Sequence, residues 1–273
     1  MAKVTFDTLK RDAKIFDELK NNSPAWWQYC KNEKTFYIEV RKDNNINVYF
    51  EGGNIIKVHY CSKHNALQTF THHKYLGLAD KTKTYVNRAE TIDQDIDKIT
   101  NGIKKHYSQK NGGNMESWSE KYIQGQLIIN NRDTHLDSEF AYIDEDRDVR
   151  IDLVKCVNGT VIFVELKRLD DNRMLKKTDD SPEIVFQMKS YADFIKKYKD
   201  KILAYYQKLY DIKKDLGLPV PEMRPQKVTT IPELLIFNRW THLDKQGRRK
   251  THLRRMEEIL QREKITYSII NSF

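Results

Sequence analysis

The segment at residues 160–168, TVIFVELKR, constrains the fold of this chain more than any other. It is a run of β-branched and apolar residues that ends in two opposite charges, Glu165 and Lys167. Because side chains alternate between the faces of a strand, these two residues share a face with Val161 and Phe163. Burying a charge is costly unless it is paired or binds a metal. The segment therefore predicts either a charged site on a buried strand or a strand end that emerges into water with an incidental ion pair.

A second strand-like segment, residues 148–157, comes directly before it and carries Asp152 near its centre. Asn158 and Gly159 separate the two segments, and this dipeptide is a strong signal for a tight β-hairpin. We therefore expect Asp152 to lie on the strand beside the one that carries Glu165.

A third short strand is predicted at residues 136–143, with Glu139 inside it. Three consecutive strands would then bring Glu139, Asp152 and Glu165 within a few ångströms of each other. Two or three carboxylates at one point form a site for a hard cation, and Mg²⁺ is the usual occupant where the protein supplies few ligands. Lys167 beside such a site is suited to orienting or deprotonating a water molecule.

These charged residues follow a fixed order along the chain, which ends in an acid–x–lysine triplet: Glu139, Asp152, Glu165, Leu166 and Lys167. The order resembles the motif of the PD-(D/E)XK nuclease superfamily. Ile151 departs from the family name, because it stands where that name has proline. The resemblance covers residues 115–270, more than half of the chain.

A further motif follows the triplet at the start of the next predicted helix. Gln187 and Tyr191 resemble the QxxxY motif that characterises the RecB-like branch of this superfamily. Because the two residues are four positions apart, they share one face of a helix. The motif therefore predicts that this helix contributes side chains to the same site.

The resemblance implies an α/β fold of the restriction-endonuclease-like type, in which helices flank a mixed central sheet. The elements predicted from residue 116 onward agree, in the order helix, three strands, helix, strand, helix, strand. We assign residues 86–273 to this nuclease-like domain. Residues 1–85 predict an N-terminal α+β extension, with a helix and a β-meander, and the sequence does not indicate its role.

The resemblance also implies a metal site of few protein ligands. Asp152 and Glu165 would hold Mg²⁺, for which Mn²⁺ can substitute, together with the backbone carbonyl of Leu166. Glu139 would bind the same ion directly or through water. A carboxylate-held divalent ion polarises phosphate oxygens and generates a nucleophile from bound water, which is the chemistry of phosphodiester hydrolysis.

Other residues would support this chemistry without binding the ion. Lys167 would position the attacking water or offset the charge that builds up in the transition state. Gln187 and Tyr191 would hold the substrate backbone or order the lysine. Nucleases of this type sometimes take a further acid from the helix before the three strands, and Glu116 and Glu120 are the candidates.

The net charge of +9 favours a polyanionic partner such as nucleic acid, and the resemblance makes DNA the expected one. The densest positive cluster lies in the last predicted helix, at Arg248, Arg249, Lys250, Arg254 and Arg255. This cluster either contacts nucleic acid or forms a solvated helix face.

Cysteine usage and hydropathy indicate the compartment. The three cysteines, Cys30, Cys61 and Cys156, are far apart, which favours a reducing environment. Three cysteines cannot supply the four ligands of the iron–sulfur cluster that some RecB-like nucleases carry, so we expect no cluster. No apolar run approaches the roughly 18 residues of a membrane helix, and we expect a cytoplasmic protein without a membrane partner.

Two other functions stay open besides a Mg²⁺-dependent deoxyribonuclease. The chain could bind nucleic acid on a nuclease-like fold without catalysis, or act as a nuclease on RNA. A structural protein whose acids form only surface ion pairs is a third reading. The complete set of two acids and an acid–x–lysine triplet favours the nuclease.

Overall fold

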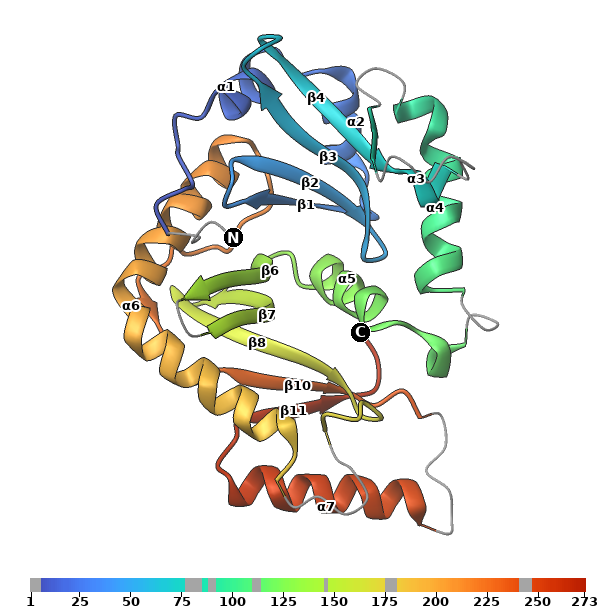
Figure 1. The fold of residues 1–273 in the computed structure, drawn as a ribbon, viewed down its shortest axis with the longest axis vertical. Coiled ribbons are helices and arrows are strands. Elements are labelled where there is room, and N and C mark those ends of the chain that lie inside the picture. Colours follow the sequence, from blue (N-terminus) through green and yellow to red (C-terminus); the bar gives the residue numbers. More distant parts are fainter. Residues whose placement is uncertain are drawn as a thin grey trace.

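Two β-sheets, one from each half of the chain, lie one above the other along the long axis of the molecule (Figure 1). The structure is a computed structural model that describes residues 6–76, 85–87, 92–109, 114–144, 147–174, 181–240 and 247–273. Helices surround both sheets, so the predicted mixed α/β class is confirmed. The restriction-endonuclease-like arrangement of the second half stays a prediction.

The first sheet is an antiparallel meander of five strands in sequence order. Its strands are β1 (Phe36–Arg41), β2 (Asn45–Phe50), β3 (Gly53–Cys61), β4 (Ala66–His72) and β5 (Tyr85–Asn87). The helices near it are α1 (Lys14–Asn21), α2 (Ala25–Asn32), α3 (His73–Leu76) and α4 (Ile92–Tyr107). This half therefore matches the predicted helix and meander, with an additional short strand at its end.

Helix α4 packs on the first sheet, although the predicted boundary after residue 85 groups it with the second half. A Cβ atom on Gly53 of β3 would lie 2.6 Å from Ile103 of α4. A Cβ atom on Gly102 would lie 2.9 Å from the carbonyl oxygen of Tyr75. Glycine at these two positions thus allows the close approach of α4.

The second sheet is mixed, with the order β11-β10-β8-β7-β6. Its strands are β6 (His135–Asp144), β7 (Arg147–Val157), β8 (Thr160–Arg168), β10 (Glu233–Phe237) and β11 (Tyr267–Ile270), and β9 (Lys227–Val228) pairs with β8. β6, β7 and β8 run antiparallel, whereas β10 is parallel to β8 and to β11. Asn158 and Gly159 both have positive φ values, 48° and 71°, which confirms the predicted tight hairpin between β7 and β8.

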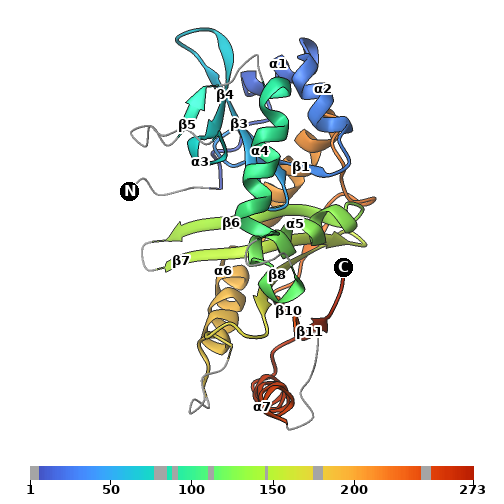
Figure 2. The same ribbon diagram turned by 90° about the vertical axis from the view of Figure 1, so that its right-hand side faces the viewer.

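Three helices flank the second sheet: α5 (Glu120–Asn130), α6 (Glu183–Asp215) and α7 (Arg248–Arg262). α5 follows a 3₁₀ turn at Met115–Ser117, begins at an N-cap formed by Ser119, and lies between the two sheets (Figures 1 and 2). The 33-residue helix α6 bends at Tyr198 and extends beside both sheets. α7 lies beyond the other end of the second sheet and packs through Met256, Ile259 and Leu260.

The two halves share one hydrophobic core. Phe6, from the N-terminal segment, stacks on Tyr142 of β6 with ring centroids 4.7 Å apart. Leu9, Val40 and Ile56 of the first half belong to the same buried cluster as residues of β7, β8 and α6. A second buried cluster also contains residues of both halves, so the predicted division into two domains does not coincide with a gap in packing.

Candidate active site

The candidate site lies where β7 and β8 separate. The pairing of the two strands begins with Val157 opposite Thr160 and ends with Leu153 opposite Val164, one residue before Asp152. Beyond this point the backbone amide of Leu166 donates to Oδ2 of Asp152 at 2.9 Å, so the carboxylate replaces the missing ladder partner. At this opening of the sheet about a quarter of the Asp152 side chain is exposed.

Glu165 and Lys167 lie buried beside this opening, as the alternation of side chains predicts. The Nζ atom of Lys167 donates to Oε1 of Glu165 and, at 2.9 Å, to the carbonyl oxygen of Leu166. It also lies 3.8 Å from Oδ2 of Asp152. The ammonium group is thus surrounded by the same three groups that are predicted to bind a metal ion.

Helix α6 adds the predicted glutamine and tyrosine to the site. Nε2 of Gln187 donates to Oε1 of Glu165 at 2.9 Å and to the hydroxyl of Tyr191 at 2.6 Å. The Tyr191 hydroxyl in turn donates to the carbonyl oxygen of Arg150 on β7. Gln187 therefore orients Glu165, and Tyr191 ties the first turns of α6 to β7.

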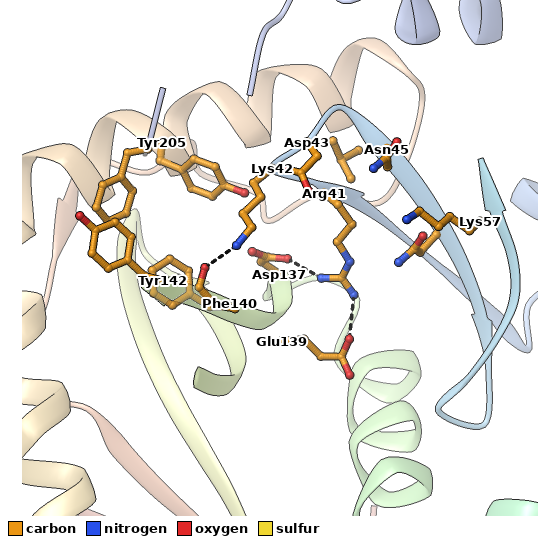
Figure 3. A pocket seen from close by; sticks show the side chains of 14 residues that line it. Arg41, Lys42, Asp43, Asn45, Lys57, Asp137, Glu139, Phe140, Tyr142 and Tyr205 are labelled. Carbon is orange, nitrogen blue, oxygen red and sulfur yellow. Dashed lines mark hydrogen bonds and ion pairs between the residues drawn. The ribbon is translucent and has the colours of Figure 1, made fainter. Parts of the chain in front are cut away.

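Glu139 does not join the other carboxylates, contrary to the prediction. It lies between two residues of β6 that pair with β7, but it makes no ladder pair itself, and its φ value of +54° turns its side chain out of the regular alternation. Its carboxylate forms ion pairs with Lys121 of α5 and Arg41 of β1 instead. Figure 3 shows Glu139 below Arg41, in a cavity between the first sheet and β6.

Asp152, Glu165 and Lys167 form the centre of the site, and the acid of α5 near this centre is Glu120. Burial is the main cause that raises the pKa of its carboxyl; the charge of Lys167 opposes the rise, and the charge of Asp152 adds to it. Of the two acids predicted in this helix, the Glu116 side chain lies outside the described residues. Glu120 is therefore the described acid of this region that lies near enough for the charges of Lys167 and Asp152 to act on its carboxyl.

The site strongly disfavours the ionised form of Glu165. Burial, followed by repulsion from Asp152, raises the pKa of its carboxyl to about 7, against the attraction of Lys167. Its second oxygen, Oε2, is buried and has no hydrogen-bond partner, and neither does Oε1 of Gln187. A buried carboxylate oxygen without a hydrogen-bond partner is suited to bind a cation.

The donor set fits a divalent ion that keeps most of its water. Among the described residues, no group of three or more His, Cys, Asp and Glu side chains is arranged to hold a metal ion. Mg²⁺ needs only one or two carboxylates and retains several waters, so Asp152, Glu165 and the carbonyl of Leu166 are sufficient. The ammonium of Lys167 would have to move aside for such an ion.

We expect replacement of Glu165 by Gln to stabilise the metal-free protein at alkaline pH. The pKa of Glu165 in the folded state, about 7, lies above the ordinary value of 4.5. Protonated Glu165 therefore makes its whole contribution to the free energy of unfolding below pH 4.5, and this contribution is lost as the pH rises through 7. In EDTA, the free energy of unfolding of Glu165→Gln should exceed that of wild type by about 1–3 kcal/mol near pH 8.5 and nearly equal it near pH 4.5.

Urea unfolding of both proteins at the two pH values measures this difference. Glu222→Gln is the control, because Glu222 is exposed and distant in sequence from the site. A Glu165→Gln protein that is less stable than wild type at both pH values would show that the Glu165 carboxylate is a net stabilising partner of Lys167.

Sequence reasoning missed two residues near the centre. Nε2 of Gln124 in α5, a buried amide, donates to the backbone carbonyl of Asp152 at 2.6 Å. Arg173, held by Asp171 at 2.7 Å, lies near enough for the charges of Glu120 and Glu165 to act on it. The sequence offered one signal for Gln124, a polar amide within an apolar run. It offered none for Arg173, because the polar loop around it has no recognisable motif.

The predicted basic cluster lies on the first three turns of α7. Lys250 and Arg254 are exposed, and Arg254 pairs with Glu258 at 2.9 Å. The guanidinium of Arg249 lies 5.2 Å from the ring centroid of Trp240, Arg255 is half-buried, and the Arg248 side chain lies outside the described residues. The exposed face of α7 is thus positively charged, and its contact with nucleic acid stays a prediction.

Comparisons with protein-family models, with curated proteins and with solved structures found no match. In the part of the chain that the structure describes, every helix is too short or too polar to cross a bilayer. The function of the chain must therefore be inferred from the chemistry of its own residues, above all Asp152, Glu165 and Lys167.

Proposed function

We propose that this protein is a Mg²⁺-dependent nuclease that hydrolyses phosphodiester bonds of DNA. One observation carries the proposal: Asp152, Glu165 and Lys167 converge where β7 and β8 separate, and Oε2 of Glu165 is buried without a partner. Leaving a buried carboxylate oxygen unpaired costs free energy, and a divalent cation would remove that cost. The order of these residues and of Gln187 and Tyr191 supports the proposal through its resemblance to the PD-(D/E)XK nucleases.

Each residue of the centre has a separate role in the proposed hydrolysis. Asp152, Glu165 and the carbonyl of Leu166 would hold Mg²⁺, which when bound polarises a phosphate oxygen and lowers the pKa of a water molecule. Lys167, moved aside from Glu165 by the ion, would offset with its ammonium group the negative charge of the phosphate in the transition state. Gln187 keeps Glu165 in place through its hydrogen bond of 2.9 Å.

Glu120 and Arg173 would act at the rim of the centre. Burial raises the pKa of the Glu120 carboxyl above its ordinary value, which favours a role in proton transfer at the rim of the centre. Arg173 is about 39% exposed, and Asp171 fixes its guanidinium through two hydrogen bonds, so it can present a donor to a phosphate oxygen. The net charge of +9 favours a polyanionic substrate over a small neutral one.

Incubation of the purified protein with labelled single-stranded and double-stranded DNA and RNA tests the proposal. We expect Mg²⁺ and Mn²⁺ to support cleavage of DNA, and EDTA to abolish it. Cleavage of RNA alone would replace the proposed substrate. Salt-sensitive binding of DNA without any cleavage would favour a nucleic-acid-binding protein on a nuclease-like fold, for which the ion pair between Lys167 and Glu165 would be structural.

A further inference from the structure

Helix α5 touches the first sheet so closely that two glycines are required at the contact. Gly52, in the turn between β2 and β3, has a φ value of +82°, and a Cβ atom there would collide with the backbone carbonyl oxygen of Lys121. A Cβ atom on Gly125 would lie 2.7 Å from the backbone nitrogen of Gly52. Backbone therefore lies directly against backbone, and the turn of the first sheet fixes the position of α5.

Apolar contacts support the same helix from both sides. Tyr37 and Tyr49 of the first sheet stack with ring centroids 4.9 Å apart and belong to one buried cluster with Ile123 and Leu127 of α5. The cluster continues into the second sheet through Leu153, Val164, Leu166 and Phe237. α5 is thus held between the two sheets, and one end of it carries Glu120 toward the centre.

A chain of polar contacts leads from the first sheet through α5 to β7. Nη2 of Arg41 lies 3.5 Å from Oε2 of Glu139, as Figure 3 shows, and Oε1 of Glu139 pairs with Lys121. Nζ of Lys121 then donates to Oε1 of Gln124 at 3.2 Å. Nε2 of Gln124 donates to the backbone carbonyl of Asp152 at 2.6 Å, where β7 separates from β8.

The backbone of Glu139 is strained in order to make this chain. A non-glycine residue with positive φ inside a strand is strained, and it persists only where its surroundings hold it. Here Arg41, Lys121 and the hydroxyl of Tyr49, at 3.4 Å, all hold the carboxylate of Glu139. These contacts therefore stabilise a backbone conformation of Glu139 that the strand alone would not adopt.

We propose that the first sheet positions the active site through Arg41 and Tyr49. Glu139 of β6 and Lys121 of α5 pass this contact on to the site as positioning residues. They hold α5 so that Glu120 faces the centre and Gln124 supports the backbone of Asp152. The inference rests on the proposed nuclease function. It assigns a role to the N-terminal region, in which the sequence alone indicates none.

Lys121→Met removes the link between Glu139 and Gln124 and keeps the length of the side chain. Groups that orient metal ligands typically contribute 10- to 100-fold to activity, so we expect kcat for DNA cleavage to fall about tenfold. KM for DNA should stay within about twofold, because the mutation leaves the basic surface of α7 unchanged. Glu139→Gln should act in the same direction, and Lys121→Arg should retain most of the activity.

Lys155→Met is the matched control. Lys155 pairs with Glu233 at 2.6 Å within the second sheet, and the two side chains are 36% and 32% exposed, compared with 41% and 39% for Lys121 and Glu139. Both substitutions break a half-exposed ion pair of small energetic value, so both melting temperatures should stay within about 4 °C of wild type. The control should change kcat by less than about twofold.

A measurement without turnover separates this inference from the proposed function. Calorimetric titration with Mn²⁺, in the absence of DNA, should give a Kd that rises several-fold in Lys121→Met and is unchanged in Lys155→Met. If wild type cleaves DNA but Lys121→Met resembles Lys155→Met in both kcat and Kd, the positioning role is overturned and the nuclease stands. If wild type neither cleaves nucleic acid nor binds Mn²⁺, both proposals fail together.

Discussion

Single replacement of Asp152, Glu165 or Lys167 should lower the rate of DNA cleavage by at least about a hundredfold, the scale of losing one preorganised charge in an active site. Suitable variants are Asp152→Asn, Glu165→Gln and Lys167→Met, because each keeps the approximate shape of the side chain. All three residues meet at one point, where Nζ of Lys167 contacts both carboxylates and the carbonyl of Leu166. Removal of any one therefore changes the electrostatic environment of the other two.

The measurement is the initial rate of cleavage of labelled DNA under single-turnover conditions, with binding measured separately in Ca²⁺. Binding should be nearly unchanged, because the basic face of α7 is not altered. Lys155→Met, which breaks an ion pair elsewhere in the same sheet, is the control. Near-normal cleavage by Lys167→Met would show that Lys167 has no catalytic role. Near-normal cleavage by all three variants would show that the active site lies elsewhere.

The sequence predicts the strand, hairpin and helix of this site well, but it does not predict the position of Glu139. Strand β8 spans the predicted residues because its alternation of apolar side chains is local, and Asn158-Gly159 specifies the adjoining hairpin. Gln187 and Tyr191 share a helix face by their spacing alone. The hairpin was sufficient to predict that Asp152 lies beside the strand of Leu166, whereas the contact of Gln187 with Glu165 was predicted only through the resemblance to the QxxxY motif.

The position of Glu139 could not be predicted in the same way. Strand periodicity assumes a regular backbone, whereas Glu139 has a φ value of +54° and its carboxylate pairs with Arg41 and Lys121, which are distant in sequence. The approach of Gly52 to Gly125 is likewise a tertiary contact that no local pattern indicates. A glycine inside a predicted helix is costly unless packing requires it, and Gly125 was the one available hint of this interface.

A buried ionic cluster joins the first sheet to α6 and β6, and breaking it should destabilise the whole protein. Nζ of Lys213 in α6 donates to Oε2 of Glu39 in β1 at 2.8 Å and to the carbonyl of Leu136 at 2.7 Å. Both charged side chains are at most 2% exposed. Oε1 of Glu39 also accepts hydrogen bonds from His135 at 2.6 Å and Ser138 at 2.9 Å.

Glu39 remains ionised because of this cluster. Burial acts to raise the pKa of its carboxyl, but the charge of Lys213 and the contact with His135 outweigh burial and lower it. Lys213→Met would leave that charge without its main partner and the carbonyl of Leu136 without its donor. Removing one member of a buried ion pair typically costs about 3–5 kcal/mol, because the other charge stays buried and uncompensated.

We therefore expect Lys213→Met to lower the free energy of unfolding in urea by about 3–5 kcal/mol near pH 7. Arg254→Met, which breaks an exposed pair with Glu258, should lower it by less than about 1 kcal/mol. The double variant Glu39→Gln, Lys213→Met should recover part of the loss, since no unpaired charge is then buried. Hydrogen exchange should show that Lys213→Met weakens protection in both sheets, because β1 and α6 are fixed by the same contact. Loss of protection confined to the first sheet would instead show that the two halves unfold independently, and the first sheet could then be removed without disturbing the site.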